Sequence, residues 1–213
     1  MDTSMSGTSP REGQYYSALY EVALSINSSL DPQQVMRSIA GSAAKALGAK
    51  GASIMLLSPD RRALYHSAAQ GLSDWYVRKG PVRVDQSMTE SLAGRSVAVF
   101  DVADDPRIQY RQQAVLEGIA SIVSVPVRLH GEVIGLVRLY SSTPREFAPH
   151  EIQFLEAVAN LGAVALANAR RYAEVSADYE SARQDLLDWY AAWGIETSAD
   201  TIARVDAPRD AAA

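Results

Sequence analysis

The stretch that decides the fold is IASIVSVPVRLHGEVIGLVRLYSS, residues 119–142. Two apolar runs, 119–129 and 132–141, flank the dipeptide His130-Gly131. Gly131 supplies the positive φ that a two-residue turn needs, so this stretch predicts a β-hairpin. Successive side chains of a strand point to opposite faces of a sheet. One face of the hairpin is therefore expected to be apolar and to pack against helices, and it carries Val123, Val125, Val127, Val133, Val137 and Leu139.

The opposite face of the hairpin is semi-polar, with Ile122, Ser124, Arg138 and Tyr140. Such a face is either washed by solvent or roofed over a small-molecule site, and residues 71–118 are long enough to form the roof. We favour a pocket in which Ser124, Arg138 and Tyr140 are the first ligand contacts, because converging polar groups orient a ligand. Arg138 suits an anionic group through charge-assisted hydrogen bonds, although pairing with an Asp or Glu under the roof is an open alternative.

The regions before this hairpin predict two helices and a second hairpin. Residues 15–30 carry apolar side chains at spacings of three and four, which is typical of an amphipathic helix. Asp31-Pro32 can begin a second helix, with Asp31 as the cap and Gln34 reaching back to it. The run 51–57, a turn at 59–62 and the run 63–70 predict a hairpin.

The stretch 71–118 is mixed and supplies the expected roof. It predicts a short helix at Trp75-Tyr76, a small helix near Met88–Leu92, a strand at 97–100 and a helical run that ends near Gly118. Trp75, Tyr76 and Met88 are roof candidates that could line the pocket, or could simply pack in the core.

A long helix is expected over residues 149–193, about 65 Å at 1.5 Å per residue. Two heptad stripes run along it, one starting at Ile152 and the other at Phe154. A helix that is apolar on two faces must bury both, so one face is expected on the domain's own sheet and the other on a partner helix. Beyond residue 173 only the second stripe remains apolar, which favours a parallel coiled coil in a homodimer. Folding of residues 174–193 back onto the first helix is the alternative.

Composition removes several classes of function. The 213 residues include no cysteine, which excludes disulfides, thiolate zinc sites and thiol nucleophiles. The net charge of −5 argues against nucleic acid and acidic membrane surfaces as direct partners. The N-terminal residues lack the apolar core of a signal peptide, so a cytoplasmic location is expected.

Four segments, at 53–64, 94–107, 119–142 and 147–172, together resemble the GAF domain family, and the similarity covers about residues 14–172. The resemblance implies an α+β fold with a central six-stranded antiparallel sheet. Helices from both ends of the chain would cover one face, and loops and short helices would roof a ligand pocket on the other. It also places Phe100 and Tyr110 where the family has pocket walls, with core packing as the alternative.

The resemblance further limits the ligand. Covalent bilin attachment needs a cysteine, whereas non-covalent binding of a pigment or another small molecule stays open. GAF-like free-methionine-sulfoxide reductases work through cysteine, so that activity is not expected here. The Asn-Lys-Phe-Asp-Glu set of cyclic-nucleotide-binding members does not align with this chain, so a cyclic nucleotide is disfavoured as the ligand but stays open. Some members bind haem, and of the three histidines only His66 could face the pocket, where an ordinary surface or core histidine is the simpler interpretation.

No catalytic motif or metal site is expected. The acidic cluster Asp101, Asp104 and Asp105 matches no calcium-loop spacing and is better explained by turns. We therefore predict a flexible leader at 1–12, a GAF-like domain at 13–173, a helical dimerisation extension at 174–193 and a disordered tail at 194–213. The predicted function is a non-enzymatic sensory or regulatory module that binds a small molecule, forms a homodimer and acts on a signalling partner. A ligand-free scaffold is the alternative.

Overall fold

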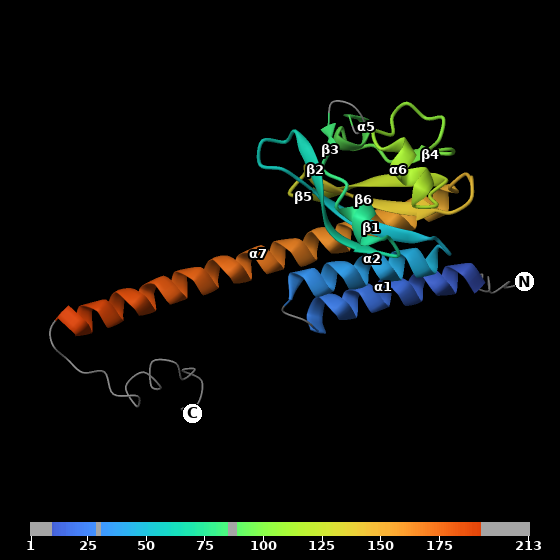
Figure 1. The fold of residues 1–213 in the computed structure, drawn as a ribbon. Coiled ribbons are helices and arrows are strands. Elements are labelled where there is room, and N and C mark those ends of the chain that lie inside the picture. Colours follow the sequence, from blue (N-terminus) through green and yellow to red (C-terminus); the bar gives the residue numbers. More distant parts are fainter. Residues whose placement is uncertain (1–9, 29–30, 85–88, 193–213) are drawn as a thin grey trace, which may run out of the picture. The chain divides into compact units, whose positions relative to one another are not determined.

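A computed structural model describes residues 10–28, 31–84 and 89–192 (Figure 1). The chain divides into two compact units, Met1–Ala169 and Arg170–Ala213. The first unit holds the sheet and its covering helices, and the second holds the C-terminal part of the long helix. The predicted tail at 194–213 and most of the predicted leader lie outside the described residues.

The first unit is built on the six-stranded antiparallel sheet that the resemblance implies. The strand order is β3-β2-β1-β6-β5-β4. The strands are β1 (Gly51–Leu57), β2 (Ala63–Gln70), β3 (Val82–Arg83), β4 (Val97–Val99), β5 (Ser121–Leu129) and β6 (Glu132–Ser141). Both predicted hairpins form, as β1–β2 and β5–β6. The two-residue strand β3 carries too little pattern to be found from the residues alone.

The turn between β5 and β6 has the conformation that its sequence predicts. Leu129 pairs with Glu132, which leaves His130 and Gly131 as the two turn residues. Their φ angles are 51° and 87°, and two successive positive φ values define a hairpin turn whose twist matches the strands. In β6, a side chain on Gly135 would collide with the backbone carbonyl of Met55, so the close approach of β1 and β6 requires glycine there.

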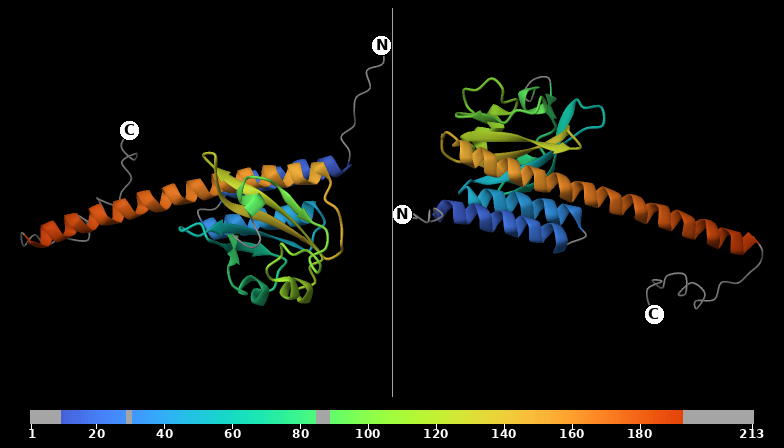
Figure 2. Two further views of the ribbon diagram at one scale, coloured as in Figure 1. Left: turned by 90° about the horizontal axis from the view of Figure 1, so that it is seen from above. Right: turned by 180° about the vertical axis from the view of Figure 1, so that it is seen from behind.

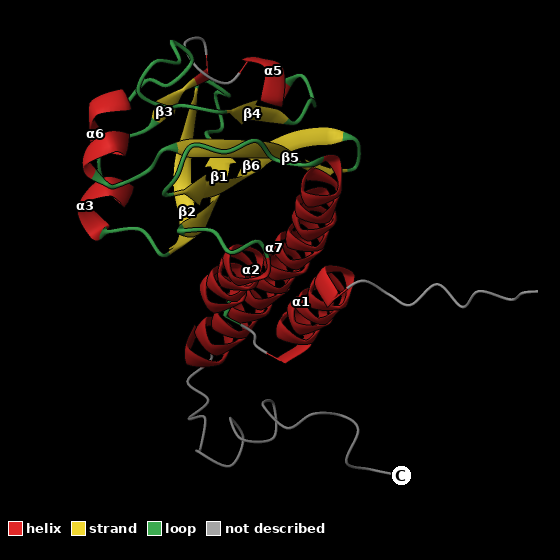
Figure 3. Ribbon diagram, turned by 90° about the vertical axis from the view of Figure 1, so that its right-hand side faces the viewer, coloured by secondary structure: helices red, strands yellow, loops and turns green. Residues whose placement is uncertain are grey.

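Helices from both ends of the chain cover one face of the sheet. These are α1 (Pro10–Ser28), α2 (Pro32–Ala46) and the N-terminal part of α7 (Pro149–Ala192) (Figures 2 and 3). Asp31 caps α2 by accepting a 2.9 Å hydrogen bond from the backbone N–H of Gln33. All six hairpin residues predicted for this face are buried, and five of them belong to the main apolar core. The prediction of a helix-covered apolar face is confirmed.

Short helices and loops cover the other face. These helices are α3 (Asp74–Val77), α5 (Thr89–Leu92) and α6 (Arg111–Leu116), and they lie across the sheet from α1 and α2 (Figure 3). Strand β4 ends at Val99, one residue before the predicted end. Beneath this roof, a second apolar cluster joins roof and sheet through Tyr76, Val99, Val102, Ile108, Ala114, Ile119, Ile122 and Tyr140.

The packing of α7 corrects the expectation that its second stripe faces only a partner. Phe154, Val158 and Ala165 of that stripe are buried inside the first unit. Phe154 stacks on Tyr15 of α1, with ring centroids 4.7 Å apart, because α1 lies where the partner was expected. Later members of the stripe are exposed, and the large apolar ones among the described residues are Tyr172, Val175, Tyr179 and Leu186.

Residues Pro149–Ala169 of α7 are long and apolar enough to cross a membrane by length and composition. An 18-residue window of this segment has a mean hydropathy of 1.3, and 44% of that window is buried inside the structure. Leu155, Val158 and Ala159 are fully buried against the sheet and its neighbours. The apolar character of this segment is therefore explained by its place in the core.

Candidate functional site

The buried polar residues of the roof-side face form a row across three strands. Ser53 of β1 pairs with Arg138 of β6, and Arg138 pairs with Ser124 of β5, so all three share one face. The Arg138 guanidinium donates from Nε to Ser124 Oγ at 3.1 Å. Only 5% of Arg138 is exposed, which is unusual for an arginine in the middle of a sheet.

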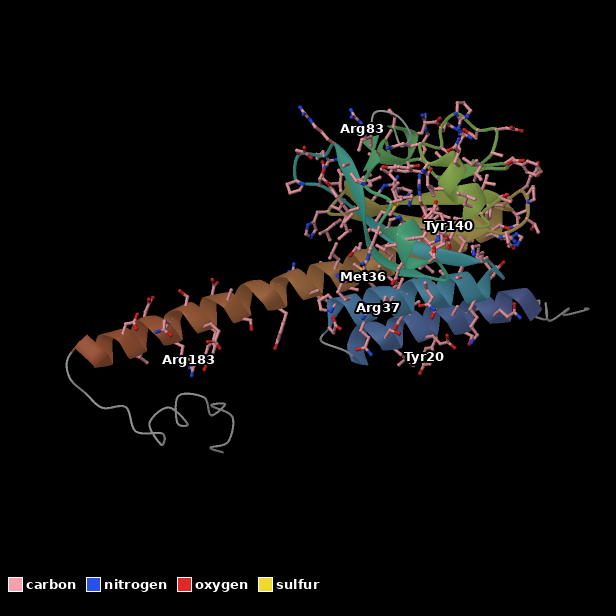
Figure 4. The ribbon with its side chains drawn as sticks, viewed as in Figure 1. Tyr20, Met36, Arg37, Arg83, Tyr140 and Arg183 are labelled. Atoms are coloured by element: carbon pink, nitrogen blue, oxygen red, sulfur yellow. The ribbon has the colours of Figure 1, made fainter. Side chains whose placement is uncertain are left out.

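A second hydrogen bond lies on the same face, two residues further along β6. The Tyr140 hydroxyl is 2.9 Å from Ser53 Oγ, and both residues are fully buried. Burial raises the pKa of the Tyr140 phenol, so the group is neutral and able to donate. Figure 4 labels Tyr140 between the central strands and the roof.

Lys79 and His66 meet above the sheet. Lys79 follows α3, and its Nζ lies 3.1 Å from Nε2 of His66, which is on β2. The same ammonium donates to the Tyr76 carbonyl at 3.0 Å and lies 3.6 Å from the centre of the Tyr76 ring. The Tyr110 ring is 5.6 Å away on another side. Lys79 is therefore held between two aromatic rings and an imidazole.

Burial and nearby positive charge lower the pKa values of both groups. Burial lowers the pKa of His66 to about 3, and the charges of Lys79 and Arg138 contribute. Burial also lowers the pKa of Lys79 to about 7, with Arg138 acting in the same direction and Glu117 against it. His66 is consequently a neutral imidazole at neutral pH, and Lys79 changes charge within the physiological range.

Glu117, just beyond α6, ties two parts of the roof together. Its carboxylate accepts a 2.8 Å hydrogen bond from the backbone N–H of Ser73 and another from the Ser73 hydroxyl. Lys50 lies 3.9 Å from the same carboxylate. These contacts fix the start of α3 relative to the end of α6. They also place Tyr76 edge-on to Tyr140, with ring centroids 6.2 Å apart.

The structure brings together the hairpin residues that the sequence singled out. The buried members of the candidate site on β5 and β6 are Ile122, Ser124, Arg138 and Tyr140. Tyr110 also lies at the site, half-buried, and donates through its hydroxyl to the Pro81 carbonyl at 3.1 Å. Tyr76 closes the site from α3 and is 2% exposed.

The remaining candidates lie elsewhere. Phe100 is 56% exposed because it follows Val99, whose side chain points inward, and successive residues point to opposite sides. Trp75 is 48% exposed on the outer side of α3, where it packs edge-on to Tyr76. Met88 lies outside the described residues.

Sequence reasoning missed two members of the site. Ser53 occupies an alternating position in β1 that its strand pattern could have placed on this face. Lys79 follows a four-residue helix in an irregular segment, where no periodicity shows which way a side chain points. His66 was noted as the histidine able to face a pocket, and it does lie on this side of the sheet.

The acidic cluster is explained by turns. Asp101 accepts a 2.9 Å hydrogen bond from the N–H of Ala103, and Asp105 accepts one of 2.8 Å from the N–H of Arg107. Asp105 also pairs with the Arg107 guanidinium, which helps to lower the pKa of its carboxyl. Within the described parts of the chain, no three His, Asp or Glu side chains come together as metal ligands do.

Open grooves also occur on the helix side. One is lined by α1, α2 and the end of β2, including Glu21, Arg37, Lys45 and Gln70. Its lining includes none of the buried polar residues described above, and its walls are exposed helix surface. The roof side has the opposite character, since its polar groups are already enclosed by aromatic and apolar side chains.

Comparisons with known proteins agree with this architecture. The family model of the GAF domain matches residues 31–166. Nif-specific regulatory proteins of Azospirillum lipoferum and Azospirillum brasilense are each 29% identical to this chain over 151 residues. That alignment covers 67% of this chain and 24% of each relative, so the similarity spans about a quarter of the length of those regulators.

Solved structures show the same fold. The GAF domain of a phosphoenolpyruvate-protein phosphotransferase from Coxiella burnetii superposes with a TM-score of 0.68 at 18% identity, covering 78% of this chain and 99% of that domain. Free methionine-R-sulfoxide reductase from Neisseria meningitidis, solved in complex with its substrate, gives a TM-score of 0.64 at 18% identity over 78% of this chain and 96% of that one. With the family model matching well over half of its residues, this chain belongs to the GAF domain family, which occurs in regulatory and signalling proteins.

Proposed function

We propose that this chain is a non-enzymatic sensory or regulatory module that binds a small molecule between the sheet and its roof. The observation that carries the proposal is the buried row of Ser53, Arg138 and Ser124, together with Tyr140. An arginine buried in a sheet face costs solvation free energy, and the fold alone does not require it. Polar groups enclosed by aromatic side chains are typical of a site that recognises a small molecule.

The similarity to known regulators supports a proposed location and context. The matched relatives from Azospirillum are regulators, and we infer a comparable signalling role in the cytoplasm for this chain. The ligand acts by favouring one packing of α3 and α6 over the sheet, because Tyr76 and Tyr110 close the site from above. A ligand can shift such an equilibrium only by its difference in affinity for the two packings.

Native mass spectrometry of the full chain, purified without denaturation, tests ligand binding. We expect a population heavier than the chain by one small molecule, and that mass is lost on unfolding. The same molecule, added back, should raise the melting temperature. Protein that carries no added mass and is not stabilised by any compound in a metabolite library would contradict the proposal.

We further propose that the chain forms a parallel homodimer through the end of α7. Tyr172, Val175 and Tyr179 are 57%, 68% and 48% exposed, and Leu186 continues their stripe at 37%. These residues repeat at the heptad spacing of a coiled-coil seam. In a parallel pair in register, Asp178 of one helix lies opposite Arg183 of the other, which adds charge complementarity at the flanks of the seam.

A double substitution tests the seam. Val175→Glu with Tyr179→Glu places like charges in the interface, and we expect a monomer in analytical ultracentrifugation. The matched control, Ala177→Glu with Gln184→Glu, puts two charges on the outward positions and should leave the dimer intact. A dimer that survives the seam substitutions contradicts this interface.

The same monomeric variant separates the ligand-binding function from a ligand-free scaffold. If the chain is a binding module, the variant keeps its small molecule, because the first unit holds every residue of the site. A scaffold has no ligand to lose and fails only in assembly.

A further inference from the structure

Three nitrogen-bearing side chains converge beneath the roof from three separate elements. Lys79 comes from the segment after α3, His66 from β2 and Arg138 from β6. The Lys79 ammonium is in hydrogen-bonding contact with His66 at 3.1 Å. Arg138 is close enough that its positive charge acts on both of the others. The cluster belongs to no single motif, and only folding assembles it.

This cluster has more hydrogen-bond donors than acceptors. In its charged form Lys79 can only donate, so among the described residues its ammonium donates to Nε2 of His66 and to the Tyr76 carbonyl, which leaves one of its three N–H groups available. Since Nε2 of His66 accepts from an ammonium, its neutral ring carries the proton on Nδ1. Nδ1 is buried and has no hydrogen-bond partner in the described part of the chain. A buried donor without an acceptor costs about 1–3 kcal/mol.

The charges around the cluster are also unbalanced. Lys79 and Arg138 are cationic groups, and Glu117 is the carboxylate whose charge reaches Lys79. That carboxylate is already engaged by the N–H and hydroxyl of Ser73 and by Lys50. The phenols of Tyr76 and Tyr140 stay neutral, because burial raises the pKa of each. Around Lys79 and His66, the groups named here therefore offer donors and positive charge for which an anion is the matching partner.

We propose that the site takes a small anion, with a carboxylate or phosphate group bound between the Lys79 ammonium, the His66 imidazole and the Arg138 guanidinium. This inference rests on the proposed ligand-binding function and specifies its chemical class. An anion supplies the missing acceptors and neutralises the buried charge, and charge-assisted hydrogen bonds are the strong ones. Ser53, Ser124 and Tyr140 then lie along the sheet to contact the uncharged part of the ligand.

Anion binding is coupled to a proton. The groups that face Lys79 are His66, Tyr76, Tyr110, Arg138 and the more distant Glu117. Burial and Arg138 hold the pKa of Lys79 at about 7, so at pH 8 much of the population is unprotonated. A bound anion stabilises the ammonium and raises that pKa. Binding at pH 8 should thus take up part of a proton.

Isothermal titration calorimetry of the full chain at pH 8 tests the inference. The probes are sodium phosphate, acetate and succinate, with acetamide and succinamide as uncharged isosteres of the carboxylates. We expect at least one anion to bind and its isostere to bind at least tenfold more weakly. Phosphate and the carboxylates are separate arms, so the preferred anion is identified. In buffers of different ionisation enthalpy, the measured heat should report proton uptake.

Two matched variants assign the effect to Lys79. Lys79→Met should weaken anion binding at least tenfold and abolish the proton uptake, whereas Lys79→Arg keeps the charge and retains binding. Arg78→Met is the control, since it removes one positive charge from the exposed neighbouring position and should leave binding unchanged. Circular dichroism verifies that each variant is folded.

Several results overturn the inference. Uncharged isosteres that bind as tightly as the anions, equal binding by Lys79→Met and wild type, or no binding of any of the three anions each contradict it. If a neutral small molecule is nevertheless retained in native mass spectrometry, the ligand-binding function stands and only the anion class is wrong. If nothing is retained, the proposed function itself fails.

Discussion

The two faces of the same sheet are buried to a similar degree but are built from different chemistry. On the helix side, Val123, Val137 and Leu139 are buried members of the main apolar core. On the roof side, the neighbouring positions Ser124, Arg138 and Tyr140 are just as deeply buried and carry polar atoms. Since the strands are shared, the difference lies in the side chains that each face presents. The apolar face stabilises the fold, and the polar face carries the site that we propose for recognition.

Leu139 and Arg138 are adjacent in β6 and provide the sharpest contrast. Leu139→Ala leaves a cavity in the helix-side core, where the residue is fully buried. We expect a loss of about 2–5 kcal/mol in the free energy of unfolding. Urea denaturation followed by circular dichroism measures it. A loss below about 1 kcal/mol would mean that the helix side is not the main source of stability.

The pH dependence of stability tests the roof-side face. Because the pKa of His66 is about 3 in the folded state against 6.5 as the reference value, protons bind the unfolded chain first as the pH falls. Stability is therefore lost progressively below pH 6.5, by up to about 1.4 kcal/mol per pH unit. Lys79 has a pKa of about 7 in the folded state against a reference value of 10.5. Its contribution to stability is also lost as the pH falls, but this loss is confined to pH values above 7.

Urea denaturation at pH 6.5, 5.75 and 5.0 isolates the His66 contribution from that of Lys79. His66→Gln should show a shallower loss of stability over this range than wild type. His130→Asn removes an exposed histidine at the β5–β6 turn and should follow wild type. Equal slopes for wild type and His66→Gln would show that His66 is not held neutral by burial.

Arg138→Met is expected to change stability far less than Leu139→Ala. It removes a buried charge and the hydrogen bond to Ser124, and it adds apolar packing of similar length. Removing the guanidinium relieves its desolvation cost, whereas the Ser124 hydroxyl loses its partner at a cost of about 1–3 kcal/mol, so we expect a net loss of about 1 kcal/mol. The same urea titration measures it. A loss as large as that of Leu139→Ala would make Arg138 a structural residue.

The smallest change in stability is expected at Phe100, which the family resemblance places in the wall of the pocket. The side chain is 56% exposed, and surface substitutions usually change stability by less than about 0.5 kcal/mol. Phe100→Ala should leave both the melting temperature and the affinity for the bound small molecule unchanged. A clear loss of affinity would place Phe100 in the site after all.

The helix-side face was predictable because its pattern is local and regular. Alternation along β5 and β6 predicts Val123, Val137 and Leu139 on one face. It predicts Ser124, Arg138 and Tyr140 on the other face, as the structure shows. The same rule applies to any half-buried strand. Strand β3, with two residues, has no period to detect.

The candidate site was only half predictable, for a physical reason. Its sheet residues follow from strand alternation, whereas Lys79 and Tyr110 lie in irregular segments. The position of Lys79 depends on a contact with His66, thirteen residues earlier on β2. The heptad stripes of α7 are visible in the sequence. The covering of Phe154 by α1, however, results from tertiary packing and cannot be read from those stripes.

The most direct test of the account is a crystal structure of the full chain purified from its native host without denaturation. We expect electron density for a small molecule between the sheet and the roof, in contact with Arg138 and Lys79. Density confined to the grooves along α1 and α2, or a roof side filled by Tyr76 and Tyr110 with no molecule bound, would contradict the assignment of the polar face to recognition.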